Sequence, residues 1–325
     1  MGPAMSITDN PIFTDADKAR EWLESVLWQD GPICPHCGIV GAAYALRNAK
    51  NRPGLYKCKG CEQQFTVTVG TIMERSHIPL NKWLLAFHLM AASKKGMSAH
   101  QIGRMLGLTY KSAWFMCHRI REAMREGKFP DLLGGPNKVV EVDETYVGGK
   151  ETNKHKSKRQ KGMHGGKGKE PVMSLVERGG RVSSHHVPKV TAKTLKPLLK
   201  EQIDAASFLM TDESVVYTPI GEAFAGHGTV NHSIQEYVRG FFFHTNTVEG
   251  YFAIFKRGIT GTFHHVSEQH LKRYLGEFDF RYNERAALGV NDNERMVKVA
   301  KGVVGKRLTY RRTRGAEEAP QTGPA

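Results

Sequence analysis

The segment VEVDETYVGG, residues 140–149, places three carboxylates in a run that otherwise alternates like a β-strand. Along such a strand Glu141 and Asp143 point to one face, and Glu144 points to the other. A carboxylate in the middle of a core strand is costly unless a cation meets it. The alternation separates Glu144 from the other two acids. We interpret both Glu141 and Glu144 as supporting or solvated residues with no assigned chemistry.

Further strands follow along the chain, with turn residues between them. They are PVMSLVERGGRVSSHHVPKV (171–190), a hairpin that turns at Gly179 and Gly180; SFLMTDE (207–213); and GTVNHS (228–233), a candidate fifth strand. Between the hairpin and SFLMTDE, TLKPLLKEQI (194–203) predicts a helix. SFLMTDE carries Asp212 at its end. If its strand lies beside the strand of residues 138–149, Asp143 and Asp212 converge on a divalent metal ion.

A third acidic group lies in HTNTVEGYFAIFKRG (244–258), which has the periodicity of a helix. Its buried stripe consists of Val248, Phe252, Phe255 and Ile259. Asn246, Glu249 and Lys256 stand on an adjoining face. Because Glu249 and Lys256 are two helical turns apart, they offer a carboxylate for a metal ion and a cation for a nearby phosphate. One such acid alone is more often a surface ion pair, but the acids together indicate a catalytic site.

Four of the five cysteines have the spacing of a metal site. Cys34 and Cys37 form one CxxC pair, and Cys58 and Cys61 form a second. Two such turns close a tetrahedral site of four thiolates, which leaves no open position, so we expect a structural zinc ion. Two disulfides or buried free thiols are the alternatives, and disulfides are disfavoured without a secretion signal. The fifth cysteine, Cys117, is expected in the core.

Helices surround this cysteine cluster in the sequence. FTDADKAREWLESVLW (13–28) predicts a short helix, and residues 79–93 predict a second with Trp83, Phe87 and Met90 inward. MSAHQIGRMLGLTYKSAWFMCHRIREAM (97–124) then predicts two more, with a cap at Ser98, a break at Gly107 and a cap at Thr109. The last three helices indicate a helix-turn-helix, with a plain helical bundle as the alternative. The candidate DNA contacts on its last helix are Lys111, Ser112, Arg119 and Arg121.

Basic segments are spread over the second half of the chain. Residues 150–169 are polar, Gly-rich and basic, so we expect a disordered loop that grips the DNA backbone, with Lys158 and Arg159 among its contacts. The helix of residues 267–285 is expected to close the core. Its inner side would carry Leu271, Tyr274, Leu275 and Phe278, and its outer side Lys272, Arg273, Arg281 and Arg285. Residues 286–325 are expected to be a basic, largely disordered tail.

The composition agrees with a globular protein that binds a polyanion. The chain has 325 residues, 40% of them hydrophobic, and 47 Lys plus Arg against 32 Asp plus Glu give a net charge of +15. No apolar run approaches the roughly 20 residues of a membrane span, and the N-terminus has no signal-peptide pattern. We therefore expect a soluble, cytoplasmic protein with no membrane partner. The chain has no GxxxxGK[ST] motif, so no nucleotide cofactor is indicated.

The order of these motifs resembles a known family. A zinc ribbon, a helix-turn-helix, VEVDETYVGG, LMTDE and HTNTVEGYFAIFKRG follow one another as in the DDE-type transposases of a bacterial insertion-sequence group related to the Merlin elements. The resemblance implies an RNase H-like catalytic domain in which Asp143 and Asp212 are the first two metal-binding carboxylates. For the third position it allows Asn or Glu, and spacing to Lys256 favours Glu249 over Asn246, which stays as the alternative or a helper.

We therefore predict a multidomain α+β protein, with an N-terminal zinc ribbon and helix-turn-helix followed by an RNase H-like α/β catalytic domain. The predicted boundaries are 13–75 for the first helix and ribbon, 76–130 for the helix-turn-helix, 137–285 for the catalytic domain and 286–325 for the tail. The predicted activity is cleavage and transfer of DNA strands at the ends of an insertion sequence, with Mg²⁺ or Mn²⁺ as the catalytic ion.

Double-stranded DNA, as element end and as target, is the expected partner. We expect at least a dimer on DNA, because two ends need two active sites. Two alternatives remain open. One is a non-catalytic DNA-binding regulator derived from a transposase, and the other is a metal-dependent nuclease without strand transfer.

Overall fold

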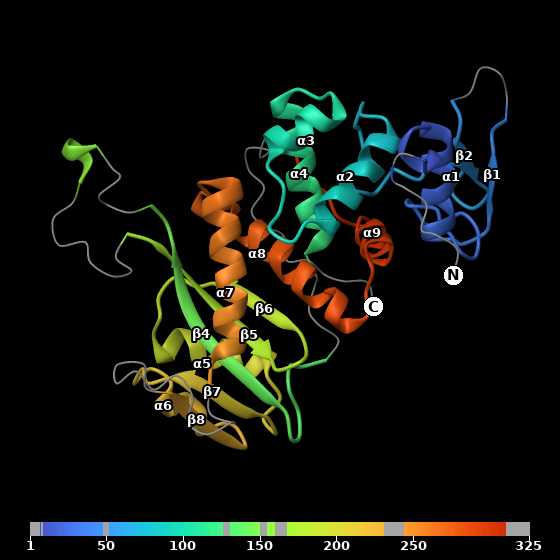
Figure 1. Cartoon of the computed structure of the whole chain (residues 1–325). Coiled ribbons are helices and arrows are strands. Elements are labelled where there is room, and N and C mark those ends of the chain that lie inside the picture. The colour runs from blue at the N-terminus through green and yellow to red at the C-terminus, as the bar shows by residue number, and fades with distance from the viewer. Residues whose placement is uncertain are drawn as a thin grey trace.

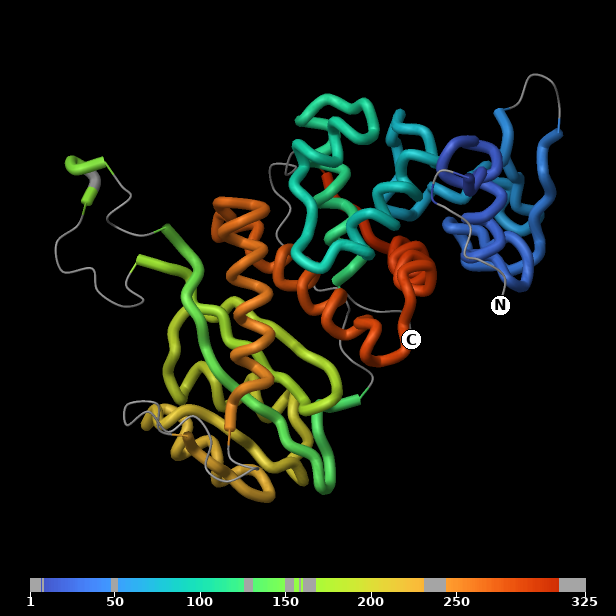
Figure 2. Tube along the Cα trace, viewed as in Figure 1, coloured from blue at the N-terminus to red at the C-terminus, as the bar shows by residue number. Residues whose placement is uncertain are grey.

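The computed structural model describes residues 7, 9–47, 52–125, 131–149, 155–159, 168–230 and 244–309. The described chain forms a small N-terminal ribbon, a helical lobe and a lobe built on a five-stranded sheet (Figures 1 and 2). Helix α8 (Glu268–Asn283) lies between the two larger lobes and contacts both of them. Within the described residues, none of the helices combines the length and the hydropathy that a bilayer crossing needs.

The ribbon is a three-stranded antiparallel sheet beside one helix. Its strands are β1 (Ala43–Ala45), β2 (Tyr56–Cys58) and β3 (Gln64–Phe65), in that order. A short 3₁₀ turn η1 (Pro11–Phe13) leads into α1 (Ala16–Leu27), which Asp15 caps through the backbone amides of Asp17 and Lys18. Trp28, at the end of α1, packs edge-on against Tyr56 and Phe65, so aromatic contacts fix the helix to the ribbon.

Three consecutive helices form the helical lobe where the sequence predicted them. They are α2 (Leu80–Ala92), α3 (Ala99–Leu106) and α4 (Tyr110–Met124). Ser98 caps α3 by accepting from the amide of Gln101, and Thr109 caps α4 by accepting from the amide of Ser112. Between them Gly107 takes a left-handed conformation, with φ of 62°, that glycine adopts at little cost.

The segment predicted as a disordered tail contributes a helix to this lobe. After a 3₁₀ turn η6 (Ala286–Leu288), helix α9 (Asp292–Lys301) begins with a capping box between Asn291 and Glu294. It packs on α2 and buries Met296, Val299 and Ala300 in the lobe's core, and Val303, just beyond the helix, lies in the same core. The prediction was wrong for these residues, because four apolar side chains at helical spacing outweigh the basic composition around them. Residues 310–325 lie outside the described part of the chain.

The large sheet has the strand order β6-β5-β4-β7-β8. Its strands are β4 (Val139–Val147), β5 (Glu170–Glu177), β6 (Val182–His186), β7 (Phe208–Asp212) and β8 (Gly226–Val230). β4, β5 and β6 pair antiparallel, while β7 and β8 run parallel to β4. The candidate fifth strand is present as β8, and residues 231–233 of that prediction lie outside the described part.

Helices cover both faces of this sheet. On one face, α5 (Ala192–Gln202) and α6 (Thr218–Gly221) pack on Val140 and Val142 of β4. On the other face lie α7 (Asn246–Gly258), a π-helical turn η5 (Ile259–Phe263) and α8, which share an apolar core with Val147. A further 3₁₀ turn, η3 (Lys156–Lys158), lies in the short described segment of residues 155–159. The central strand β4 is therefore sandwiched between two cores.

A buried ionic cluster joins α4 to α8. Glu277 is fully buried, and its carboxylate accepts from Arg121 Nε at 2.6 Å and from Arg281 Nη1 at 2.5 Å. We predicted solvent-facing roles for both arginines, and both are buried instead. The reason is that α4 and α8 pack their basic sides against each other. On an isolated helix this side would face solvent, but here the neighbouring helix covers it.

This cluster generates a stability prediction. Glu277→Gln leaves Arg121 and Arg281 buried without a counter-charge, so the free energy of unfolding should fall by about 3–5 kcal/mol. Glu222→Gln, at an exposed glutamate beyond α6, is the matched control and should change it by less than about 0.5 kcal/mol. Urea unfolding of both variants tests this, and equal midpoints for the two would contradict it.

Candidate active site

Asp143 and Asp212 lie next to each other on the neighbouring strands β4 and β7, at the end of the sheet where β7 ends. β4 and β7 are parallel neighbours, with Glu141 paired to Met210, so two residues further along the strands Asp143 and Asp212 lie level. Carboxylate oxygens of Asp143, Glu144 and Asp212 all lie within 4.8 Å of one another. The expected convergence of the first two acids on one site is therefore present in the geometry.

Glu144 belongs to this acidic group, contrary to our prediction that the strand would separate it. The pairing of β4 with β7 ends at Glu141, whereas the pairing with β5 continues to Val147. β4 therefore presents an open edge beside Asp212, and carboxylates from both of its faces reach around that edge. Tyr217, a buried residue just before α6, donates its hydroxyl to Glu144 at 2.5 Å and holds it there.

Burial and neighbouring negative charges make Asp143 and Glu144 harder to ionise. Burial raises the pKa of Asp143 to about 7, and the charges of Glu144, Asp212 and Glu249 add to the increase, while the Glu144 amide that donates to it opposes the increase. Burial likewise raises the pKa of Glu144, against the lowering effect of its hydrogen bond from Tyr217. A crowded group of partly buried carboxylates favours a bound cation.

Helix α7 brings the other candidate residues toward this edge. Glu249 lies close enough to Asp143 for its charge to raise the pKa of that carboxyl, and it accepts from Thr245 Oγ1 at 3.1 Å. Asn246 is exposed in the first turn of α7. Lys256 is exposed two turns beyond Glu249, with its ammonium 5.8 Å from the centre of the Phe252 ring. Among the described residues, the three-acid group with 4.8 Å separations does not include Glu249.

Glu141, to which we had assigned no chemistry, is the anchor of α7. Its fully buried carboxylate accepts from the backbone amides of Thr247 and Val248 at 2.8 and 3.0 Å, in the first turn of that helix. The Thr247 hydroxyl donates at 2.9 Å, Arg178 Nε donates at 2.6 Å and His244 lies at 3.3 Å. A carboxylate at a helix N-terminus is stabilised by the free amides and the helix dipole. A capping partner more than a hundred residues away in the chain gave no local sequence signal.

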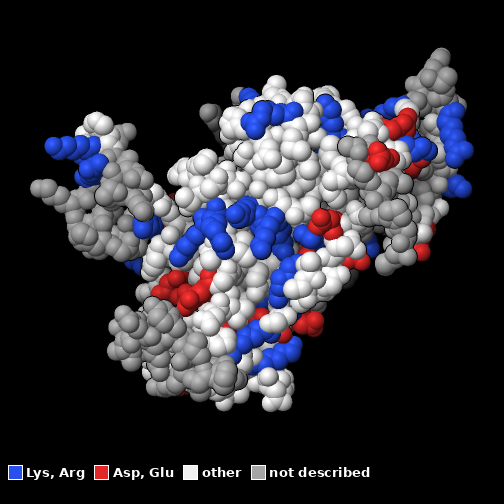
Figure 3. All heavy atoms as spheres, viewed as in Figure 1, with Lys and Arg blue, Asp and Glu red and all other residues white. Residues whose placement is uncertain are grey.

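The donor set at the sheet edge fits a hard divalent cation. Asp143, Glu144 and Asp212 offer only carboxylate oxygens, which are the ligands that Mg²⁺ and Mn²⁺ prefer. In the view of Figure 3, acidic side chains gather next to an arc of Lys and Arg that crosses the middle of the molecule. The molecular surface therefore places positive charge beside acidic residues on this face, as a site for a phosphodiester needs.

The four ribbon cysteines form a cluster with the geometry of a metal site. All four sulfurs lie within 4.8 Å of one another, and the Cys34–Cys61 and Cys37–Cys58 pairs are 3.6 Å apart. These separations are close to the ~3.8 Å edge of a tetrahedron with Zn–S bonds of ~2.3 Å. They are far longer than a disulfide bond, and all four thiols are free. Cys117 is buried in the helical core, as expected.

The candidate DNA contacts differ in how open they are. Lys111 and Ser112 are exposed in the first turn of α4. Arg119 is half-buried and donates to the carbonyls of Glu74 and Leu308 at 3.1 and 3.3 Å, so it ties α4 to two other segments. In the η3 region Arg159 is exposed, whereas the side chain of Lys158 and most of residues 150–169 lie outside the described part of the chain.

Comparisons with known proteins point to one class. Residues 132–283 match the family model of the ISXO2-like transposase domain, and residues 14–64 match that of the transposase zinc-ribbon domain. A Halobacterium salinarum protein, described as an uncharacterized protein in transposable element ISH50, is 29% identical over 283 residues, which are 83% of this chain and 91% of that protein.

A solved structure also aligns with part of the chain. A chain of the simian T-cell lymphotropic virus intasome, in complex with PP2A regulatory subunit B56 gamma, is 16% identical over 55% of this chain. The present chain spans 63% of that chain, less than two thirds, with a TM-score of 0.26.

The raised pKa of Asp143 generates a prediction about stability and pH. The folded pKa of about 7 exceeds the ordinary value of 3.8, so the folded state holds a proton that the unfolded state releases between these values. Wild-type stability should therefore decrease as the pH rises through this window. Asp143→Asn removes the penalty, so without divalent metal at pH 8 it should be more stable than wild type by roughly 1–3 kcal/mol.

Thermal unfolding at pH 5 and pH 8 measures this difference, which should shrink at pH 5. Asp131→Asn, at an exposed aspartate before β4, is the matched control and should behave as wild type. An Asp143→Asn protein that is no more stable than wild type at pH 8 would contradict the assignment of a buried, mutually repelling acid group.

Proposed function

We propose that this chain, which belongs to the insertion-sequence transposases with a zinc ribbon and an ISXO2-like transposase domain, binds the ends of an insertion sequence and cuts and joins DNA strands there. The observation that carries the proposal is the meeting of Asp143 and Asp212 at the open edge of the sheet. An RNase H-like arrangement is supported by the strand order, with three antiparallel strands followed by two parallel ones around a central β4.

In the proposed reaction, Asp143 and Asp212 hold divalent metal ions. When bound, these ions activate the attacking oxygen and neutralise charge on the phosphate and the leaving oxygen. Water is the first nucleophile: it attacks a phosphodiester at the end of the element, breaks the P–O3′ bond and frees a 3′-hydroxyl. That hydroxyl then attacks a phosphodiester of the target, which releases a 3′-hydroxyl of the target strand. Lys256, exposed on α7, would hold a phosphate near the scissile bond as a fixed positive charge.

Glu249 is our proposed third carboxylate. Its charge contributes to the raised pKa of Asp143, and the Glu141 cap fixes α7, the helix that carries Glu249, to β4. Asn246 remains the alternative or a helper, because it lies on the same helix one turn earlier. Glu144 is held by Tyr217 and is proposed to orient or supplement the metal ligands.

The helical lobe is proposed to act as a helix-turn-helix, with the start of α4 at the DNA. Lys111 and Ser112 are exposed in that turn, next to backbone amides at the helix N-terminus that attract phosphate. Arg119 and Arg121 are engaged within the protein, so Arg119 is proposed only for a contact at the margin of the interface and Arg121 for none. Lys158 and Arg159 are proposed to contact the DNA backbone.

The cysteine cluster is proposed to hold one structural Zn²⁺ that fixes the ribbon beside this lobe. At least a dimer on DNA is proposed, because one complex must act on two ends. The non-catalytic regulator and the nuclease without strand transfer are the competing functions. Both keep DNA binding, so the activity assay must separate cleavage from joining.

The assay uses a labelled duplex that carries the ends flanking this gene, with Mg²⁺ or with EDTA. Wild type should nick the ends and join them to target DNA only with Mg²⁺. Asp212→Asn, which retains an oxygen for the Ser214 amide, should reduce cleavage at least 10³-fold and leave end binding within threefold. Glu249→Gln should lose as much, whereas Asn246→Ala should lose less than tenfold if Glu249 is the third ligand.

Glu222→Gln is the control for the effect of a glutamate-to-glutamine substitution in itself. Tight end binding by wild type without any cutting would replace the transposase with the regulator. Cutting without joining would favour the nuclease.

A further inference from the structure

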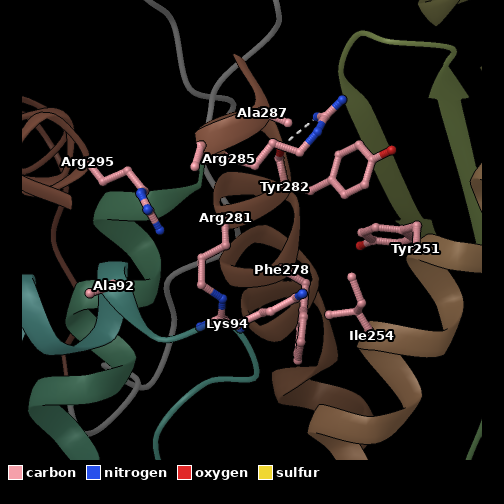
Figure 4. A pocket seen from close by; sticks show the side chains of 11 residues that line it. Ala92, Lys94, Tyr251, Ile254, Phe278, Arg281, Tyr282, Arg285, Ala287 and Arg295 are labelled. Carbon is pink, nitrogen blue, oxygen red and sulfur yellow. Dashed lines mark hydrogen bonds between the residues drawn. The ribbon is translucent and has the colours of Figure 1, made fainter. Parts of the chain in front are cut away.

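A cavity of about 420 Å³ lies where α7 and α8 of the sheet lobe meet the helical lobe. Figure 4 shows its walls: side chains of α7 and α8 on one side, and Ala92, Lys94 and Arg295 on the other. Ile254 and Tyr282 give it an apolar part. The cavity is separate from the acids of the candidate active site, none of which lines it.

Positive charge exceeds negative charge around this cavity. Lys94, Arg281, Arg285 and Arg295 line it. Among the described residues, the acids that pair with this set are Glu277, which Arg281 shares with Arg121, and Asp292, which pairs with Arg295 at 2.5 Å. Glu277 and Asp292 are each already paired with at least one arginine, so the lining of the cavity has a net positive charge.

Two of these arginines have buried nitrogen atoms with no hydrogen-bond partner among the described residues. Arg281 is only 6% exposed, and its Nη1 donates to Glu277 while Nε and Nη2 have no hydrogen-bond partner among the described residues. Arg295 donates from Nη1 to the Ala91 carbonyl at 3.1 Å, and its buried Nε likewise has no partner within the described chain. A buried donor without an acceptor costs about 1–3 kcal/mol, so an acceptor that reaches these groups lowers the free energy.

The size and lining of the cavity decide which anion fits. Guanidinium groups bind phosphate oxygens through paired hydrogen bonds, which makes phosphate the matching anion. A phosphate alone would leave most of 420 Å³ unfilled. The apolar part next to Ile254 and Tyr282 suits a base and a sugar, and arginines beside aromatic rings are the usual surroundings of unpaired nucleotides.

We propose that this cavity binds one unpaired nucleotide of a DNA strand, with its phosphate on Arg281, Arg285 and Arg295 and its base against Ile254 and Tyr282. The proposal rests on the proposed function, in that the chain must bind DNA. A free nucleotide has the same chemistry and is the other source of such a ligand. Because the walls come from both lobes, a bound strand end would tie the helical lobe to the sheet lobe.

The test compares two labelled duplexes of the same sequence, one blunt and one with a single unpaired nucleotide at its end. Wild type should bind the second at least tenfold more tightly. Ile254→Trp fills the cavity without changing charge, and it should abolish the preference while leaving the affinity for the blunt duplex within twofold. Thermal unfolding shows whether this variant folds.

Lys94→Gln provides a second variant that does not depend on fitting a larger side chain. It should reduce the preference at least threefold, whereas Lys272→Gln, the same charge change at an exposed position of α8, should leave the preference unchanged. Calorimetric titration with free dTMP distinguishes the two sources of the ligand. Tight binding of dTMP without a preference for the unpaired end would overturn the DNA assignment in favour of a free nucleotide.

Equal wild-type binding to both duplexes, without dTMP binding, would overturn the nucleotide site while leaving the proposed function in place. Failure to bind either duplex would instead contradict the proposed function. The two ideas therefore fail in different ways.

Discussion

The arrangement of the candidate site depends on one buried carboxylate. Glu141 accepts from the amides of Thr247 and Val248 and from the side chain of Arg178, so it fixes the start of α7 to the central strand. Asp143 stands two residues further along the same strand. One strand therefore supplies both an acid of the site and the anchor of the helix that carries Glu249. A fully buried acid is tolerated because its partners satisfy it, and removing any of them would expose that cost.

The lobes are joined by a different kind of contact. Glu277 on α8 holds Arg121 of α4, and α9 returns from the end of the sheet lobe to pack on α2. The chain thus passes from the helical lobe into the sheet lobe and then returns to the helical lobe. Helix α4 is connected through its buried side to α8, which shares an apolar core with α7, the helix that carries Glu249.

The sequence predicted those features that local patterns determine. CxxC spacing identified the cysteine cluster, caps at Ser98 and Thr109 placed two helices, and a strand ending in Asp212 predicted its meeting with Asp143. Features that depend on what covers a helix were missed. Arg121 and Arg281 look like surface residues on their own helices and are buried only because α4 and α8 face each other. Glu144 was misplaced because alternation along a strand does not show where the neighbouring strand ends.

The most direct test of the account is a structure of the protein soaked with Mn²⁺, located by anomalous scattering. The account predicts manganese within about 2.3 Å of carboxylate oxygens of both Asp143 and Asp212, with Glu249 turned toward it and Glu141 still bound to the start of α7. Manganese at Glu141 with α7 displaced would contradict the account, as would the lack of manganese between Asp143 and Asp212 at saturating concentration.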